Sequence, residues 1–247
     1  MGNKILKDDV AIVTGAIRNI GREIAETFAE NGAKVAIVHH KKEPAAATAA
    51  EIRSDGYNAV GIRADVTDAN DVASMVETVE EKFGKIDILV NNAAVSDRSH
   101  FIELDVEMFD KVLAVNLRGT FLCTQAAAQS MKKSGGGRII NISSTSAHRG
   151  RPNATAYATS KSGILNFTRS TAKALAEDGI RVNTLSPTRS GSRVGSDTER
   201  SGPAPKDILA GRWGTPRDQA NAALFLASPQ NDFITGTELL VDGGSSA

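Results

Sequence analysis

The sequence predicts an α/β fold, in which a doubly wound parallel sheet carries helices on both faces, in a single domain spanning residues 1–247. Short apolar runs alternate with helix-length amphipathic segments along the chain, and this alternation is typical of parallel strands joined by crossover helices. A glycine-containing turn also follows the first apolar run directly. Such a turn between a strand and a helix allows the backbone to approach a phosphate closely.

The first half of the chain contains three strand–helix units. Each expected strand is a short run dominated by Val, Ile and Ala, and each expected helix repeats its apolar residues at helical spacing. The expected strands are 10–13, 34–38 and 59–62, and the expected helices are 19–30, 44–54 and 69–83.

The second half repeats this rhythm and then adds a loop. Residues 186–205 are rich in Ser, Gly, Arg and Pro with few apolar side chains, so we expect a substrate loop at about 186–212 that closes over a site. A surface loop without that role is the alternative. The expected strands are 86–90, 138–142, 181–185 and 238–241, and the expected helical regions are 107–133, 154–177 and 217–227.

Composition excludes several classes of partner. The 29 basic residues balance 29 acidic ones, which argues against binding to nucleic acid or to an anionic membrane surface. Cys123 is the only cysteine, so an intramolecular disulfide or a cysteine-based zinc site is excluded, and the four histidines are not spaced as metal ligands. With a polar amino terminus and no apolar run of membrane-spanning length, we expect a soluble, cytoplasmic protein without a metal.

The glycine-containing turn runs from Thr14 to Gly21 and leads into the helix that begins at Asn19. The amino end of that helix supplies N–H donors and partial positive charge to a pyrophosphate. A dinucleotide site that prefers NAD usually has a carboxylate about 20 residues further on, but residues 39–42 read His-His-Lys-Lys. We therefore expect NADP(H), with NAD(H) as the alternative. The cations expected at its 2′-phosphate are Arg18, His39, His40 and Lys41.

A proton-transfer set is expected in the second half. Tyr157 and Lys161 lie four residues apart, so in a helix they share a face, and the ammonium group favours the phenolate. Ser144, from another segment, can hold a carbonyl or alcohol oxygen against the phenol. This combination indicates redox chemistry between a carbonyl and an alcohol.

These residues together resemble the single-domain short-chain dehydrogenase/reductase family, which has a Rossmann-type fold, and the resemblance covers essentially the whole chain. Asp65-Val66 resembles the pair that contacts adenine, Asn91-Asn92-Ala93 the segment beside the cofactor, and residues 241–244 the common carboxyl-terminal ending. The family's catalytic tetrad falls on Asn116, Ser144, Tyr157 and Lys161.

The resemblance implies a role for each member of the tetrad. Tyr157 would be the general acid in reduction and the base in oxidation, and Ser144 would orient the substrate oxygen. Lys161 would lower the pKa of the tyrosine and bind the nicotinamide ribose, and Asn116 would hold a water that links Lys161 to a proton relay. The cofactor-binding residues implied are Gly15, Arg18, Asn19, Ile20, Gly21, His39, His40, Lys41, Asp65, Val66, Asn92, Ala93, Tyr157, Lys161, Pro187, Thr188, Ser190 and Ser192.

The chain departs from the family pattern at three places. Asn19 replaces the middle glycine of the turn, and asparagine tolerates a left-handed backbone better than most residues. Ala94 replaces the glycine that usually closes the Asn-Asn-Ala segment. Residues 187–192 replace the usual Pro-Gly and later threonine, and Ser192 is expected to substitute for that threonine.

By resemblance, the substrate lies among residues 94–96, 145–151 and 188–203, which are polar and contain no aromatic side chain. A small polar ketone, with an anionic group met by guanidinium donors, is the expected substrate. The alternatives are a 3-oxoacyl-carrier-protein reductase, an NAD-dependent polyol or sugar dehydrogenase, and a non-catalytic NADP-binding sensor. A homotetramer is also expected. The substrate residues expected are Ser144, His148, Arg149, Tyr157 and Arg193, with Arg189 nearby.

Overall fold

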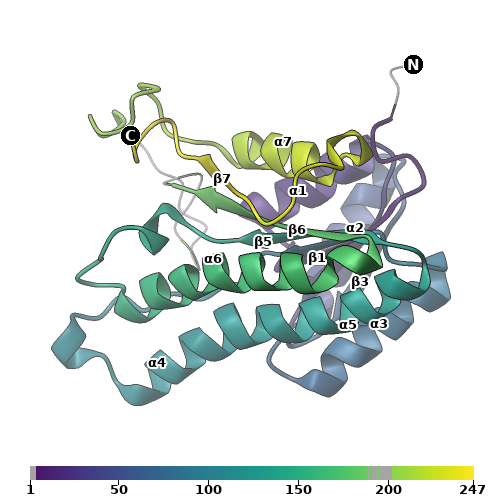
Figure 1. The fold of residues 1–247 in the computed structure, drawn as a ribbon, viewed down its shortest axis with the longest axis horizontal. Helices are drawn as coiled ribbons and strands as arrows, with labels where there is room; N and C mark the ends of the chain where they lie inside the picture. Colours follow the sequence, from purple (N-terminus) through teal and green to yellow (C-terminus); the bar gives the residue numbers. More distant parts are fainter. Residues whose placement is uncertain (1–3, 189, 191–193, 195–201) are drawn as a thin grey trace.

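The computed structural model describes residues 4–188, 190, 194 and 202–247. Within them the chain forms one parallel sheet of seven strands in the order β3-β2-β1-β4-β5-β6-β7 (Figure 1). The order reverses between β1 and β4, so a crevice opens beyond their carboxyl ends, where folds of this kind bind ligands. The strands are β1 Val10–Thr14, β2 Lys34–His39, β3 Ala59–Arg63, β4 Ile88–Asn91, β5 Gly137–Ile142, β6 Ile180–Pro187 and β7 Glu238–Val241.

Helices cover both faces of the sheet, as the sequence predicts (Figure 1). One face carries α1 (Asn19–Glu30), α2 (Lys42–Ser54) and α7 (Pro216–Ala227). The other carries α3 (Ala69–Phe83), α5 (Gly119–Lys133) and α6 (Thr155–Leu175), with α4 (Val106–Leu113) packed against α6.

The two hydrophobic cores follow from the period of two in the strands. In β1, Ala11 and Val13 pack with α1 and α7, whereas Val10 and Ile12 pack with α3 and α5. Because both faces of the strand are covered, every residue of β1 is buried. Burial on both faces accounts for the continuous apolar run in β1. The strand ends at Thr14, where the glycine-containing turn begins.

The expected helical region 107–133 is interrupted in the structure. It consists of α4, a π-helical segment at Ala114–Arg118 and α5. The wider turn has no signature in the periodicity of the sequence, and π segments of this kind occur frequently at functional sites. It contains Asn116, whose side chain is completely buried.

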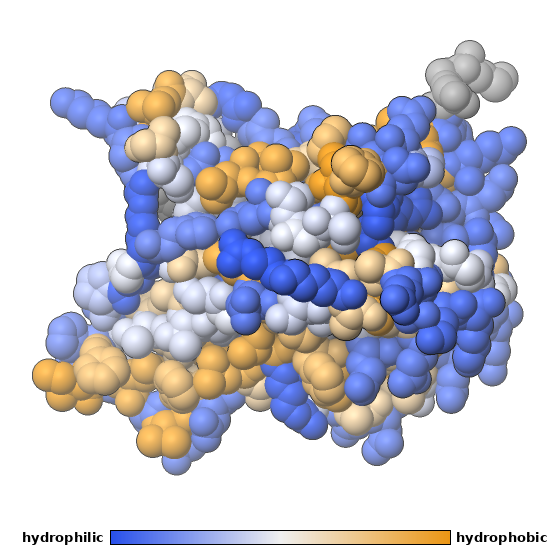
Figure 2. Space-filling view, viewed as in Figure 1, coloured by the Kyte–Doolittle hydropathy of each residue, from blue (hydrophilic) through white to orange (hydrophobic). Residues whose placement is uncertain are grey.

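Large apolar side chains are exposed at one end of the molecule. Phe101, Ile102 and Val106 have relative exposures of 67%, 85% and 69%, and Figure 2 shows apolar surface over this region around α4. The homotetramer expected from the family resemblance would pair the helices around residues 112–131 and 156–176 between subunits. In the described part of the chain, every helix is too short or too polar to cross a bilayer.

Candidate active site

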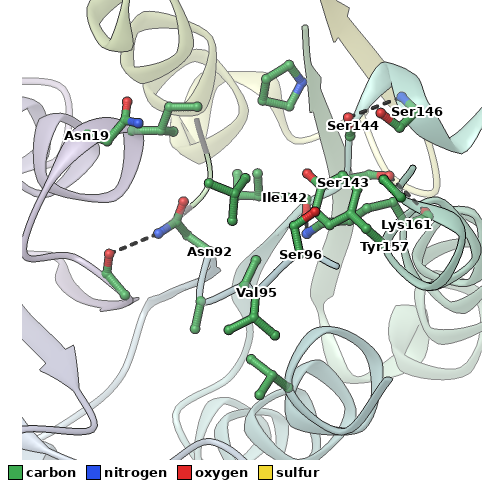
Figure 3. Close-up of a pocket in the computed structure, with 18 of the residues that line it drawn as sticks. Asn19, Asn92, Val95, Ser96, Ile142, Ser143, Ser144, Ser146, Tyr157 and Lys161 are labelled. Carbon is green, nitrogen blue, oxygen red and sulfur yellow. Dashed lines mark hydrogen bonds between the residues drawn. The ribbon is translucent and has the colours of Figure 1, made fainter. Parts of the chain in front are cut away.

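A cleft of about 1190 Å³ runs along the carboxyl edge of the sheet. It extends from the turn after β1 to the loops after β5 and β6. Figure 3 shows Ser144, Tyr157 and Lys161 gathered on one side of it and Asn19 on the other. The site residues expected from the sequence that line the cleft are Gly15, Arg18, Asn19, Ile20, Gly21, His39, His40, Asp65, Val66, Asn92, Ala93, Ser144, Arg149, Tyr157, Lys161, Pro187, Thr188 and Ser190.

The turn after β1 uses left-handed backbone at two positions. Gly15 has φ of 65° and Asn19 has φ of 51°, which agrees with the tolerance of asparagine for this conformation. Gly21 packs so closely that an added Cβ would lie 2.7 Å from the Gly15 carbonyl oxygen. The turn is therefore compact, and Arg18 precedes the first residue of α1.

Asn92 joins the end of β4 to this turn. Its Nδ2 donates to the carbonyl oxygens of Thr14 at 2.9 Å and Gly15 at 3.2 Å. The Thr14 hydroxyl oxygen accepts from the backbone N–H groups of Asn92 at 3.0 Å and Ala93 at 3.1 Å. These bonds hold the two central strand ends, and hence both walls of the crevice, in fixed register.

Basic side chains gather where β2 ends. The rings of His39 and His40 lie with centroids 4.1 Å apart, and both residues line the cleft with Arg18. Burial lowers the pKa of His39, and the positive charges of His40, Arg18 and Lys41 lower it further. Lys41 is exposed and does not line the cleft, so the structure places it outside the group that faces the cavity.

Asp65 lies at the same end of the cleft. Its Oδ1 accepts from the backbone N–H of Thr67 at 2.9 Å and from the Thr67 hydroxyl at 2.7 Å. These hydrogen bonds lower the pKa of Asp65 despite partial burial, and the nearby charge of His40 lowers it as well. The carboxylate is thus held in its ionised form beside Val66.

Tyr157 and Lys161 come from the first turns of α6. The Lys161 Nζ lies 5.6 Å from the centroid of the Tyr157 ring and donates to the Ile142 carbonyl oxygen at 2.6 Å. The Ser143 hydroxyl donates to the Lys161 carbonyl oxygen at 2.8 Å, which ties α6 to the end of β5. The helix and the strand end therefore bring the three predicted side chains together.

The environment shifts both ionisable groups. Burial lowers the pKa of Lys161 to about 7, because an apolar surrounding disfavours the ammonium form. Burial raises the pKa of Tyr157, while hydrogen bonding to Ser144 and the charge of Arg151 oppose that rise. The sequence suggested that Lys161 favours the phenolate. In the structure the net direction for Tyr157 is upward, because desolvation outweighs the favourable interactions.

Asn116 lies behind the cleft rather than on its wall. Its Nδ2 donates to the Val95 carbonyl oxygen at 2.9 Å and to the Ser160 hydroxyl at 3.0 Å, and its Oδ1 accepts from the Val95 N–H at 2.9 Å. The Ser160 hydroxyl in turn donates to the Tyr157 carbonyl oxygen at 2.7 Å. Asn116 therefore links the segment after β4 to the tyrosine.

Pro187, Thr188 and Ser190 line the end of the cleft beyond β6. Thr188 contacts the Thr145 and Ser245 hydroxyls, each at 3.3 Å. Ser190 is buried and accepts from the Gln219 side chain at 2.9 Å. The predicted site residues Ser192 and Arg193, and Arg189 with them, lie outside the described residues.

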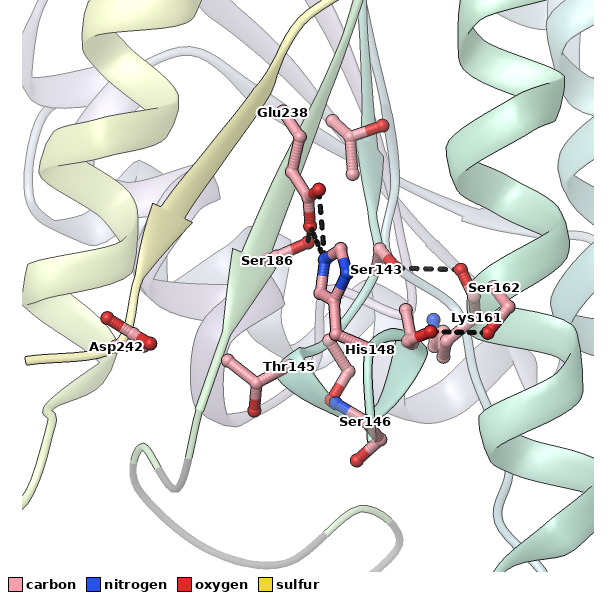
Figure 4. A network of polar contacts seen from close by, with 12 residues as sticks. Ser143, Thr145, Ser146, His148, Lys161, Ser162, Ser186, Glu238 and Asp242 are labelled. Atoms are coloured by element: carbon pink, nitrogen blue, oxygen red, sulfur yellow. Dashed lines mark hydrogen bonds and ion pairs between the residues drawn. The ribbon is translucent and has the colours of Figure 1, made fainter. Parts of the chain in front are cut away.

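His148 points away from the cleft (Figure 4). Its Nε2 lies 2.8 Å from Glu238 Oε1, and the Ser186 hydroxyl donates to the same oxygen at 2.5 Å. This placement does not support the expected contact of His148 with the substrate. The backbone at the end of the 3₁₀ turn Thr145–Ala147 directs the imidazole toward β7, and no local sequence pattern reveals that direction.

Several cleft residues were not expected from the sequence. Asp97 and Arg98 line the cleft directly after the expected segment 94–96. Their position next to that segment is the only sequence feature that could have indicated them. Lys111 comes from α4, and nothing in its sequence context marks it. Arg151, in contrast, lies within the expected segment 145–151, and it donates to the Ser146 hydroxyl at 3.2 Å.

Comparison with known proteins agrees with this fold. A family model described as enoyl-(acyl carrier protein) reductase matches residues 15–246. The chain belongs to the short-chain dehydrogenase/reductase family. It is an oxidoreductase of the CH–OH/C=O type, and this family binds nicotinamide cofactors.

Relatives in the family differ in their substrates. The chain is 37% identical to a 3-oxoacyl-[acyl-carrier-protein] reductase of Synechocystis sp., with 97% of both chains covered. It is 39% identical to a D-threitol dehydrogenase of Mycolicibacterium smegmatis, covering 97% of this chain and 93% of the relative. A gluconate 5-dehydrogenase from Burkholderia cenocepacia, solved with NADP and tartrate, superposes with a TM-score of 0.90 at 32% identity and covers 99% and 98% of the two chains.

Proposed function

We propose that this protein is an NADP(H)-dependent oxidoreductase that reduces a small polar ketone to a secondary alcohol. The observation that carries the proposal is one continuous cleft, in which an end lined by Arg18, His39 and His40 leads to Ser144, Tyr157 and Lys161. At one end Arg18 supplies positive charge that suits a phosphorylated nucleotide. At the other end the proton donor Tyr157 lies beside the buried side chain of Lys161.

The residues present fit a dinucleotide. Gly15 and Gly21 let the turn pack closely against Asn92 and Ala93, where a side chain would clash, and the amino end of α1 would provide N–H donors to a pyrophosphate. Arg18, His39 and His40 would meet a 2′-phosphate, and in the described part of β2 and its following turn no carboxylate precedes Glu43. The cofactor would supply a hydride to the carbonyl carbon.

The protein side chains would then manage the charge that develops on the carbonyl oxygen. Tyr157 would donate its phenolic proton to that oxygen, and the Ser144 hydroxyl would orient it by a hydrogen bond. Burial raises the pKa of Tyr157, so the phenol carries its proton at neutral pH, and the Ser144 hydrogen bond and the charge of Arg151, which lower that pKa, would assist its release. Lys161, whose Nζ lies near the Tyr157 ring, would bind the ribose hydroxyls of the cofactor. Asn116 would hold α6 in place against the segment after β4 through Ser160 and Val95.

The substrate end of the cleft favours a polar compound with negative charge. Arg98, Arg149 and Arg151 line it, and their described hydrogen-bond partners are the neutral oxygens of Val194, Ser245 and Ser146. Guanidinium groups whose partners among the described residues are all neutral are suited to bind a carboxylate on a ligand. The gluconate 5-dehydrogenase solved with NADP and tartrate is consistent with such a substrate.

Reduction of an acyl group on a carrier protein is the second candidate. The relative in Synechocystis sp. and the matching family model favour it. The end of α6 opposes it, because Glu177 and Asp178 follow the helix where a basic surface would meet an acidic carrier, and Asp178 is paired with Lys132 at 2.8 Å. An NAD-dependent polyol or sugar dehydrogenase would use the same chemistry, and the D-threitol dehydrogenase relative keeps that alternative open.

The cofactor preference is tested by fluorescence titration of the purified protein with NADPH and NADH. We expect NADPH to bind more tightly, and Arg18→Ala to weaken NADPH by about tenfold while leaving NADH nearly unchanged, which corresponds to one charge-assisted hydrogen bond. Lys41→Ala is the matched control, because this cation lies outside the cleft and should have the smaller effect. Equal binding of the two nucleotides would contradict the NADP assignment.

A further inference from the structure

The amino end of α6 has no cap of its own. Its N-cap residue, Ala154, has no side chain that can accept a hydrogen bond, although the first N–H groups of any helix need partners outside the helix. Asp97 supplies them from a distant part of the chain. Its Oδ1 accepts from the Tyr157 N–H at 2.9 Å and its Oδ2 accepts from the Ala156 N–H at 3.2 Å.

Asp97 is itself held firmly. It is only 1% exposed and lies in the segment that follows β4. Two residues earlier, Val95 exchanges two backbone hydrogen bonds of 2.9 Å with the Asn116 side chain, and the Ser96 hydroxyl donates to the Asp97 carbonyl oxygen at 2.9 Å. The carboxylate therefore has a fixed position relative to the sheet.

The backbone of Tyr157 is bound on both sides. Asp97 accepts from its N–H, and Ser160 donates to its carbonyl oxygen. Ser160 also accepts from Asn116, which binds Val95. The network thus closes on itself, from the segment after β4 through the π segment and α6, and returns to Asp97.

The charge of Asp97 suits this place. A carboxylate near the positive end of a helix is stabilised by the helix dipole, and hydrogen bonds from N–H groups to an ionised oxygen are stronger than neutral ones. Both carboxylate oxygens accept from α6 and the residue is almost completely buried, so Asp97 is poorly placed to bind a substrate hydroxyl even though it lines the cleft.

We propose that Asp97 is a positioning residue for the reaction: it fixes the first turn of α6 so that the Tyr157 hydroxyl stays beside Ser144. The effect of Asp97 on turnover rests on the proposed function. Its effect on the position of Tyr157 does not. Because the side chain acts through the helix backbone, its loss should disturb the tyrosine and leave the nucleotide end of the cleft unchanged.

Tyr157 can be observed alone, because the chain contains two tyrosines, Tyr57 and Tyr157. In a Tyr57→Phe background labelled with ¹³C at the tyrosine ζ carbon, Tyr157 gives the single resonance. We expect Asp97→Asn, which keeps one acceptor oxygen, to shift or broaden that resonance, and Asp97→Ala to do so more strongly. With the best ketone found, kcat should fall about tenfold for Asp97→Asn, while the Kd for NADPH stays within about twofold.

Asp105→Ala is the matched control. Asp105 caps α4 by accepting from the Met108 N–H at 2.6 Å, and α4 contributes no member of the tetrad. We expect this variant to lower the melting temperature as the Asp97 variants do, but to leave the Tyr157 resonance and kcat unchanged.

Two results would overturn the inference. A folded Asp97→Asn protein with the parental resonance and kcat would make the carboxylate a stabilising cap and nothing more. A parallel loss of NADPH affinity and kcat would assign Asp97 to the cofactor. If no carbonyl is reduced by the parent protein, the proposed function fails, but the resonance still reports whether Asp97 positions Tyr157.

Discussion

The two ends of the cleft are built differently. At the Tyr157 end the polar groups are buried and locked: Lys161 is 2% exposed and Asn116 is completely buried, and both are hydrogen bonded to backbone atoms. At the His39 end the basic side chains lie near the surface, and His40 is exposed. Proton transfer depends on the distance between donor and acceptor and on how far both are removed from water. Attraction of a phosphate requires only positive charge nearby.

This difference predicts how the two ends respond to substitution. A change to the Tyr157 hydroxyl at the buried end should remove chemistry and leave nucleotide binding largely intact, because most of the expected nucleotide contacts lie at the other end of the cleft. A change at the exposed end should alter affinity by modest factors, since surface charges are screened by solvent and salt.

The largest effect is expected for Tyr157→Phe. It removes the proposed proton donor without changing the volume of the side chain, so kcat should fall by about 10²- to 10⁴-fold, the usual contribution of general acid catalysis. The change is measured by steady-state oxidation of NADPH with the best ketone, beside a fluorescence titration of NADPH. If Tyr157→Phe instead lost affinity for NADPH, the two ends of the cleft would not have the separate roles described above.

An intermediate effect is expected from pH. Burial lowers the pKa of Lys161 to about 7, so its charge is lost as pH rises through that value. Since kcat/KM for NADPH reports the free enzyme, it should decline above about pH 7.

In Lys161→Arg the guanidinium stays charged over the whole range, so the decline near pH 7 should disappear even though the rate is lower. Persistence of the same decline in this variant would assign it to another group.

The smallest effect is expected at the substrate end. Arg151→Met should raise KM for a keto acid by about fivefold while leaving KM for its methyl ester unchanged, because one exposed charge-assisted contact is lost. His148→Ala is the control: its imidazole faces Glu238 rather than the cleft, so both KM values should stay the same. If His148→Ala raised KM for the keto acid, His148 would contact the substrate after all.

The sequence alone predicted the fold class and most of the cleft, for local physical reasons. Apolar runs of strand length alternating with amphipathic helices require a covered parallel sheet. The spacing of Tyr157 and Lys161 places both on one face of a helix, and the left-handed backbone at Asn19 agrees with its residue type. These features are encoded within a few consecutive residues.

Other features depend on contacts between distant segments, and only the tertiary structure decided them. Asp97 meets the amino end of α6 across 60 residues of sequence, and His148 turns toward Glu238 across 90. The pKa of Tyr157 rises because of how the chain buries it. Local periodicity fixes which elements form, but the packing of those elements determines which side chains share a cavity and how strongly they are desolvated.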